Sequence, residues 1–202
     1  MKIISSMLLA LIFTGVMCAQ ESDNTSNYKP LFGFNVGLNQ SAIYNSNALD
    51  ELQIKNAPGF RLGVFAEFPI SKGWAVSPKT ELSSNYGSVI IKDIGYRVDP
   101  VNLDFMLHFK HKIKSYNSKV QPFINVGPNL RTPLHSNFEG VSLNTKVSLA
   151  ADFGFGLKID ANYFYFSPEL RFSGGLTDIR KYPSGNILRG SNAVLTLNFT
   201  GK

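Results

Sequence analysis

Residues 146–160, KVSLAADFGFGLKID, alternate apolar with small or charged side chains along their whole length. The apolar row consists of Val147, Leu149, Ala151, Phe153, Phe155, Leu157 and Ile159. A period of two residues gives a β-strand two different faces. Strands of soluble proteins usually run about 5–6 residues, whereas a tilted strand that crosses a membrane needs about 9–11. The length of this stretch therefore indicates a membrane-spanning strand.

The same alternation recurs seven more times in the chain. It covers residues 31–40, 59–68, 74–84, 98–110, 120–132, 163–173 and 192–200. The copy at 120–132 is weaker, because Pro122 and Pro128 each remove a donor from the hydrogen-bond ladder. We therefore predict an all-β fold with eight strands.

The connections between these strands alternate in length. Long connections cover 41–58, 85–97, 133–145 and 174–191, short ones 69–73 and 161–162, and the connection 111–119 is intermediate. Short turns at one rim and long loops at the other are typical of an up-and-down membrane barrel, with the turns periplasmic. We predict an eight-stranded antiparallel up-and-down transmembrane β-barrel over residues 31–202, integral to the outer membrane of a Gram-negative bacterium.

The size of the side chains indicates which face points inward. An eight-stranded barrel is only just wide enough to be filled by side chains, so the bulky apolar rows belong on the lipid side. The other rows are rich in Gly, Ser and Asn and carry charges of both signs. Buried charges persist when they are paired, so we predict a structural polar network that fills the lumen. Its members are Arg61, Glu67, Lys79, Glu81, Asp104, Asp152, Lys158, Glu169 and Arg171.

Aromatic residues cluster near the predicted strand ends on the short-turn side. They are Phe32, Phe68, Trp74, Phe109, Tyr163, Phe164 and Phe199. Aromatic girdles mark the interfaces of membrane barrels, although aromatic residues also favour strands of any kind. We interpret these residues as a periplasmic-side girdle.

The first residues have the composition of a secretory signal. Lys2 precedes an apolar run at 7–16, and Ala19 precedes a polar stretch, so we expect residues 1–19 to be cleaved and 20–30 to form a short periplasmic segment. Lipidation of Cys18 is an alternative that the preceding Met17 disfavours. Cleavage after Ala19 would leave a mature chain without cysteine.

No constellation of catalytic or metal-binding residues emerges from the sequence. His108, His111 and His135 lack metal-ligand spacing. His108 shares a predicted face with Asp104, but no nucleophile is placed beside the pair. We expect no enzymatic activity, no cofactor and no metal. The net charge of +6 is not concentrated in a basic run with interleaved aromatics, so we expect no nucleic-acid partner.

Several segments resemble a known family. The strand FGFNVGLN, the segment GFRLGVFAEFPISKGWAVSPKTEL, and the later VQPFINVGP and DFGFGLKI are similar to the PorT-like outer-membrane β-barrel domain of Bacteroidota. The resemblance covers residues 31–199 and implies an eight-stranded outer-membrane barrel. The family's namesake takes part in secretion and gliding machinery, and the family supplies no catalytic motif.

The alternating Leu195, Leu197 and Phe199 resemble the C-terminal strand signal by which barrels are recognised for assembly. Residues 200–202 depart from the common terminal aromatic. We therefore expect the barrel assembly machinery as a partner during biogenesis, and outer-membrane lipid as the lasting environment.

Two classes of function remain open from the sequence. The first is a structural or interaction barrel whose long loops or N-terminal segment engage an envelope or secretion partner. The second is a small-solute porin, which the mixed-charge lumen disfavours. A rim-sited lipid-modifying enzyme and a soluble periplasmic lipid-binding barrel with its apolar face inward are further alternatives.

Overall fold

The computed structural model describes most of the chain from residue 29 onward. The described residues are 29–45, 53–56, 58–84, 87–91, 94–98, 101–113, 119–135, 137–138, 141–142, 146–178, 180–181 and 187–202. The predicted signal peptide, Cys18 and most of the segment 20–30 lie outside them. Within this described part, no helix is long and apolar enough to cross a membrane.

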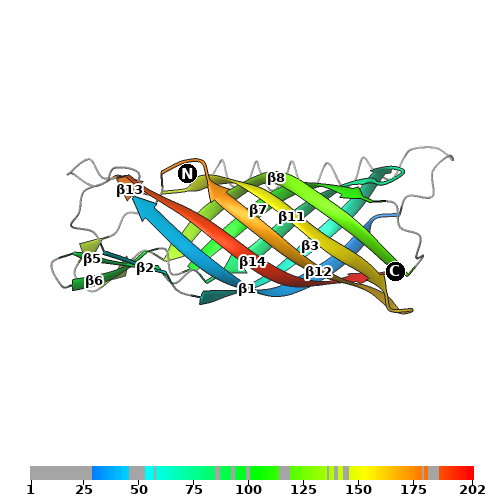
Figure 1. The fold of residues 1–202 in the computed structure, drawn as a ribbon, viewed down its shortest axis with the longest axis horizontal. Helices are drawn as coiled ribbons and strands as arrows, with labels where there is room; N and C mark the ends of the chain where they lie inside the picture. Colours follow the sequence, from blue (N-terminus) through cyan, green and yellow to red (C-terminus); the bar gives the residue numbers. More distant parts are fainter. Residues whose placement is uncertain are drawn as a thin grey trace, which may run out of the picture.

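Eight long strands form one closed barrel (Figure 1). They are β1 (Leu31–Asn45), β3 (Pro58–Ser71), β4 (Trp74–Ser83), β7 (Val101–Lys112), β8 (Val120–His135), β11 (Ser148–Asp160), β12 (Phe164–Gly175) and β14 (Ile187–Gly201). Each pairs antiparallel with the next in chain order, and β14 pairs with β1 to close the sheet. The predicted eight-stranded antiparallel up-and-down barrel is confirmed.

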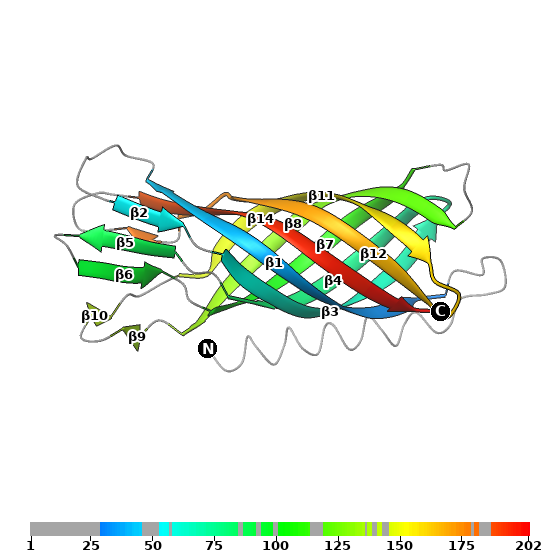
Figure 2. The ribbon, with the colours of Figure 1, turned by 60° about the horizontal axis from the view of Figure 1, so that its bottom comes forward.

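Six short strands lie in the long connections, where the sequence predicted loops. β2 (Gln53–Asn56), β5 (Gly87–Ile91) and β6 (Ile94–Val98) form a three-stranded sheet, β9 (Asn137–Phe138) pairs with β10 (Val141–Ser142), and β13 (Arg180–Lys181) extends the barrel sheet beside β14. All of them lie at the end of the barrel opposite the C-terminus (Figure 2).

The start of the strand predicted at 98–110 was wrong. Val98 pairs with Gly87 inside the hairpin of β5 and β6, and the barrel strand β7 begins at Val101. Val98 is apolar and lies inside the predicted stretch 98–110, but it belongs to the small sheet of the long-loop end. Alternation shows that a residue is in a strand and does not show in which sheet the strand lies.

The barrel is apolar outside and polar inside, as predicted. On β11, Phe153 and Phe155 are 52% and 47% exposed, whereas Asp152, directly before Phe153, is 1% exposed. The apolar residues buried in the described part are few: Phe65, Ala75, Met106, Phe123, Ala150 and Val194. The alternative of a soluble barrel with its apolar face inward is therefore wrong, because that reading requires Phe153 and its row to line the interior.

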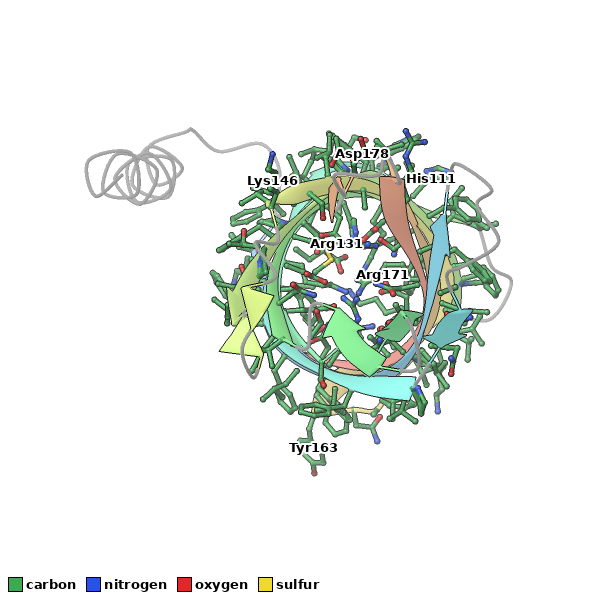
Figure 3. All side chains as sticks on the ribbon, turned by 90° about the vertical axis from the view of Figure 1, so that its left-hand side faces the viewer. His111, Arg131, Lys146, Tyr163, Arg171 and Asp178 are labelled. Carbon is green, nitrogen blue, oxygen red and sulfur yellow. The ribbon has the colours of Figure 1, made fainter. Side chains whose placement is uncertain are left out.

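The outer surface carries aromatic residues near the short-turn rim. Phe32, Trp74, Phe109, Tyr163 and Phe164 are exposed there, and Figure 3 shows Tyr163 pointing away from the barrel. Phe68 and Phe199 are partly exposed, and the Phe199 ring lies 5.1 Å from that of Phe34. These seven positions are those expected for an interfacial girdle.

Glycines make room for two buried aromatic rings of the lumen, those of Phe65 and Phe123. A Cβ atom at Gly33 would lie 2.6 Å from the Phe65 ring, and one at Gly156 would lie 2.6 Å from the Phe123 ring and 2.5 Å from the carbonyl oxygen of Pro168. Gly156 therefore leaves the space that the Phe123 ring occupies inside the barrel.

We expect Gly156→Ala to lower the free energy of unfolding by about 1–3 kcal/mol, because the added methyl group overpacks the lumen against a backbone carbonyl. Urea unfolding of the protein in lipid vesicles measures this change. Gly174→Ala is the matched control, since its Cβ would meet nothing within 4 Å. Equal stability of the two variants would contradict this account of the lumen packing.

Candidate functional site: the charged lumen

Eight charged side chains fill the middle of the lumen, each at most 5% exposed. This central cluster consists of Arg61, Lys79, Glu81, Asp104, Arg131, Asp152, Glu169 and Arg171. These side chains lie in the lumen because every second residue of each strand faces inward. Figure 3 shows Arg131 and Arg171 pointing into the lumen. With four cations and four anions, the central cluster is electrically balanced.

Glu81 is the hub of the central cluster. Its Oε2 accepts hydrogen bonds from Arg171 at 2.5 Å and from Arg61 at 3.0 Å, and its Oε1 accepts one from Asn35 at 2.6 Å. Arg61 also donates to Asp104 at 2.7 Å. Such charge-assisted bonds are about twice as strong as neutral ones, so the carboxylate of Glu81 joins two guanidinium groups that would otherwise repel each other.

Two ion pairs of the central cluster span the full width of the barrel. Glu81 and Lys79 lie on β4, and their partners Arg171 and Glu169 lie on β12, with three barrel strands between β4 and β12 on either side. The Lys79 Nζ and a Glu169 carboxylate oxygen are 3.6 Å apart. Side chains from opposite walls therefore meet at this level of the lumen.

Asp152 is the second centre of the cluster. It lies 3.1 Å from Nε2 of His108 and accepts hydrogen bonds from the Asn129 amide at 3.2 Å and from the Ser173 hydroxyl. The Nε of Arg171 is 3.6 Å away. These neighbours surround the carboxylate with donors and cations, which is the arrangement that a buried charge requires.

A separate group of charges lies toward the short-turn end, which is periplasmic in barrels of this kind. This mouth cluster consists of Glu67, Lys110, Lys112 and Lys158. The Glu67 carboxylate oxygens lie 3.1 Å from Lys110, 3.3 Å from Lys112 and 3.4 Å from Lys158. Glu67 on β3 and Lys158 on β11 are again on opposite strands. Unlike the central cluster, the mouth cluster has more cations than anions.

The structure places all nine residues of the predicted network inside the lumen, none more than 8% exposed. Seven of them belong to the central cluster, and Glu67 and Lys158 belong to the mouth cluster. The sequence interpretation missed Lys110 and Arg131, which are also buried in the lumen. Both could have been found, because Lys110 shares the row of Asp104 on β7 and Arg131 shares the row of Asn129 on β8.

His108 does not pair with Asp104, the acid that the sequence analysis considered for it. Its imidazole contacts Asp152, and the Ser173 hydroxyl donates to that same carboxylate. In a catalytic triad the histidine lies between the serine and the acid. Here the acid lies between the histidine and the serine, so these three residues do not form a triad. Among the described residues, no group of three His, Cys, Asp or Glu side chains is arranged to hold a metal ion.

Comparison with known proteins agrees with the geometry. The profile of the outer membrane protein beta-barrel domain family matches residues 18–181. The crystal structure of the outer membrane protein OprG from Pseudomonas aeruginosa superimposes with a TM-score of 0.54 at 14% identity, covering 89% of this chain and 98% of that one. Neisserial surface protein A gives a TM-score of 0.52 at 12% identity, covering 83% and 95%. At these identities the two structures share the fold alone. No curated protein matches the sequence.

Proposed function

This chain belongs to the outer membrane protein beta-barrel domain family, and we propose that it is a closed, non-conducting barrel that acts through its surfaces as a structural or interaction protein. The observation that carries the proposal is the meeting of side chains from opposite walls at two levels. Glu81 contacts Arg171 in the central cluster, and Glu67 contacts Lys158 in the mouth cluster. A pore would need a continuous column of water where these bonds lie.

The long-loop end supports an interaction role. Its three-stranded sheet has the order β2-β5-β6, so that within the described residues the edge strand β6 pairs with one neighbour, β5. An open edge is a template for pairing with an extended segment of another protein, and loops at an outer surface carry binding more often than strands do. An envelope or secretion protein is the partner class that we propose, and the PorT-like resemblance of the sequence supports it.

Outer-membrane lipid and the barrel assembly machinery are the other partners in the proposal. The apolar residues Leu195 and Leu197 on β14 face outward, 51% and 37% exposed. A small-solute porin is the second candidate function, and the bridged lumen disfavours it. We propose no enzymatic activity, because His108 and the Asp152 carboxylate that it contacts are each only 1% exposed inside the lumen.

We expect the purified protein to show no sustained ohmic conductance in planar bilayers. A double variant, Glu81→Ala with Arg171→Ala, removes the opposite-wall bond while keeping the lumen charge balanced, so its conductance should rise above that of the wild type. Sustained ohmic conductance of the wild type would overturn the non-conducting barrel and favour the porin.

The interaction role is tested separately by crosslinking in the native membrane. We expect a defined adduct that disappears when residues 53–56 and 87–98 are replaced by short Gly-Ser turns, with the barrel itself still assembled. Identical adducts from the two proteins would place the partner elsewhere and contradict the role of the β2-β5-β6 sheet.

A further inference from the structure

The periplasmic mouth of the barrel holds more positive charge than its carboxylates neutralise, and we propose that it is a binding site for a phosphate group. The mouth opens into a pocket of about 240 Å3 among the ends of β7, β8, β11 and β12. Its polar lining comes from Lys112, Lys119, Lys158, Gln121, Tyr165 and Asp160. The phosphate site is a separate proposal from the non-conducting barrel, and its test measures binding and not conductance.

The excess charge follows from counting the groups that meet there. Lys110, Lys112 and Lys158 all converge on the single carboxylate of Glu67, so three positive charges face one negative charge. Asp160, the acid that lines the pocket, accepts a hydrogen bond from Lys202 at 2.5 Å, and this ion pair offsets its charge. The mouth cluster retains two net positive charges, while the central cluster above it retains none.

Two of these ammonium groups lie over aromatic rings. The Nζ of Lys110 lies 4.3 Å from the centre of the Phe123 ring, and the Nζ of Lys158 lies 4.3 Å from that of Tyr165. Lys158 is only 8% exposed. A concave site with an excess of one sign of charge, and with a low dielectric around it, focuses the field on an incoming counter-ion. An anion entering from the periplasm therefore meets preorganised cations.

The charge and the donors match a phosphate group better than a carboxylate. A phosphate monoester carries about −1.5 to −2 at neutral pH, close to the two charges in excess, whereas a carboxylate would offset only one. Lysine ammonium groups bind phosphate as point charges. The Gln121 amide and the Tyr165 hydroxyl add neutral donors at the same pocket. A lipid headgroup at the rim and a soluble phosphorylated molecule share this chemistry.

Titration of the full protein in phosphatidylcholine nanodiscs with inorganic pyrophosphate tests the site by calorimetry. We expect saturable binding that weakens about tenfold in Lys158→Gln, because one buried cation of the site is lost. Lys72→Gln is the matched control, since Lys72 is exposed on the short turn at the same rim and the change in charge is identical. Its affinity should equal that of the wild type.

A second variant separates binding from folding. Glu67→Gln removes the carboxylate that competes for the three lysines, so pyrophosphate should bind more tightly than to the wild type even if the barrel is less stable. A role of the mouth cluster in stability alone predicts no such gain. Failure of the wild type to bind, equal loss in Lys158→Gln and Lys72→Gln, or weaker binding by Glu67→Gln would each overturn the proposal.

The lipid composition distinguishes the sources of the phosphate. Competition from phosphatidic acid in the nanodisc would support a headgroup as the natural occupant, and unchanged pyrophosphate binding would support a soluble ligand. Polyglutamate that binds as tightly as pyrophosphate, and with the same dependence on Lys158, would overturn the phosphate class in favour of an acidic protein segment.

Discussion

Glu81→Gln is expected to lower the free energy of unfolding by about 3–5 kcal/mol, the cost of leaving buried charges without their partner. Glu81 is fully buried and neutralises two guanidinium groups, those of Arg61 and Arg171. An amide keeps the shape of the side chain but not its charge, so two arginines face each other across the lumen. Chemical unfolding of the protein in lipid vesicles measures the loss.

Two comparisons identify the cause of that loss. The double variant Glu81→Gln with Arg171→Gln restores the balance of charge and should be more stable than the sum of the single changes predicts, which is the signature of a coupled pair. Asp160→Asn is the exposed control, because the Asp160–Lys202 pair lies at the periplasmic turn with side chains 37% and 32% exposed. It should change stability little. Strict additivity of the two lumen changes would contradict the hub role of Glu81.

Phe153→Arg is expected to hinder assembly and to cost about 2–4 kcal/mol, the penalty for a charge on the lipid face near the midplane of a barrel. Phe153 lies near the middle of β11 and is 52% exposed on the outer surface. The heat-modifiable mobility of the folded barrel in gels measures assembly, and vesicle unfolding measures the free energy.

The depth of the substitution provides the control. Leu149→Arg places the same charge on the same face of β11, four residues nearer its long-loop end, where the penalty falls to about 0–1 kcal/mol. Phe153→Leu keeps the position apolar and should assemble like the wild type. If Phe153→Arg were as stable as Leu149→Arg, the outer row of β11 would not meet hydrocarbon.

The eight barrel strands and their two faces could be predicted because alternation at a period of two reports directly on the environment of each side chain. Residues 146–160 show this most clearly, and Ser148–Asp160 is the strand observed. The alternation does not show where a strand ends when neither of its faces meets hydrocarbon. β1 runs on to Asn45 and β14 begins at Ile187, both beyond the predicted limits at the long-loop side, because pairing such as that of Asn45 with Leu188 continues without an apolar row.

The mouth cluster could not be predicted from the alternation of inward and outward residues. Lys110 has the parity of an inward residue, which places it in the lumen, but parity says nothing about its height along the barrel. Because the strands are tilted, residues far apart in sequence reach the same level, as Glu67 and Lys158 do. The three lysines around one carboxylate are therefore visible only once the strands are assembled.

The sequence by itself determined which side chains meet lipid and which line the lumen, because the bulk of the apolar rows exceeds what an eight-stranded interior can hold. Only the tertiary structure decided the partners: Glu81 with Arg61 and Arg171, Asp152 with His108, and Glu67 with three lysines. The reason is that closure, β1 to β14, and strand tilt together set the height of every inward residue. The alternation within a single strand shows neither the closure of the barrel nor the tilt of its strands.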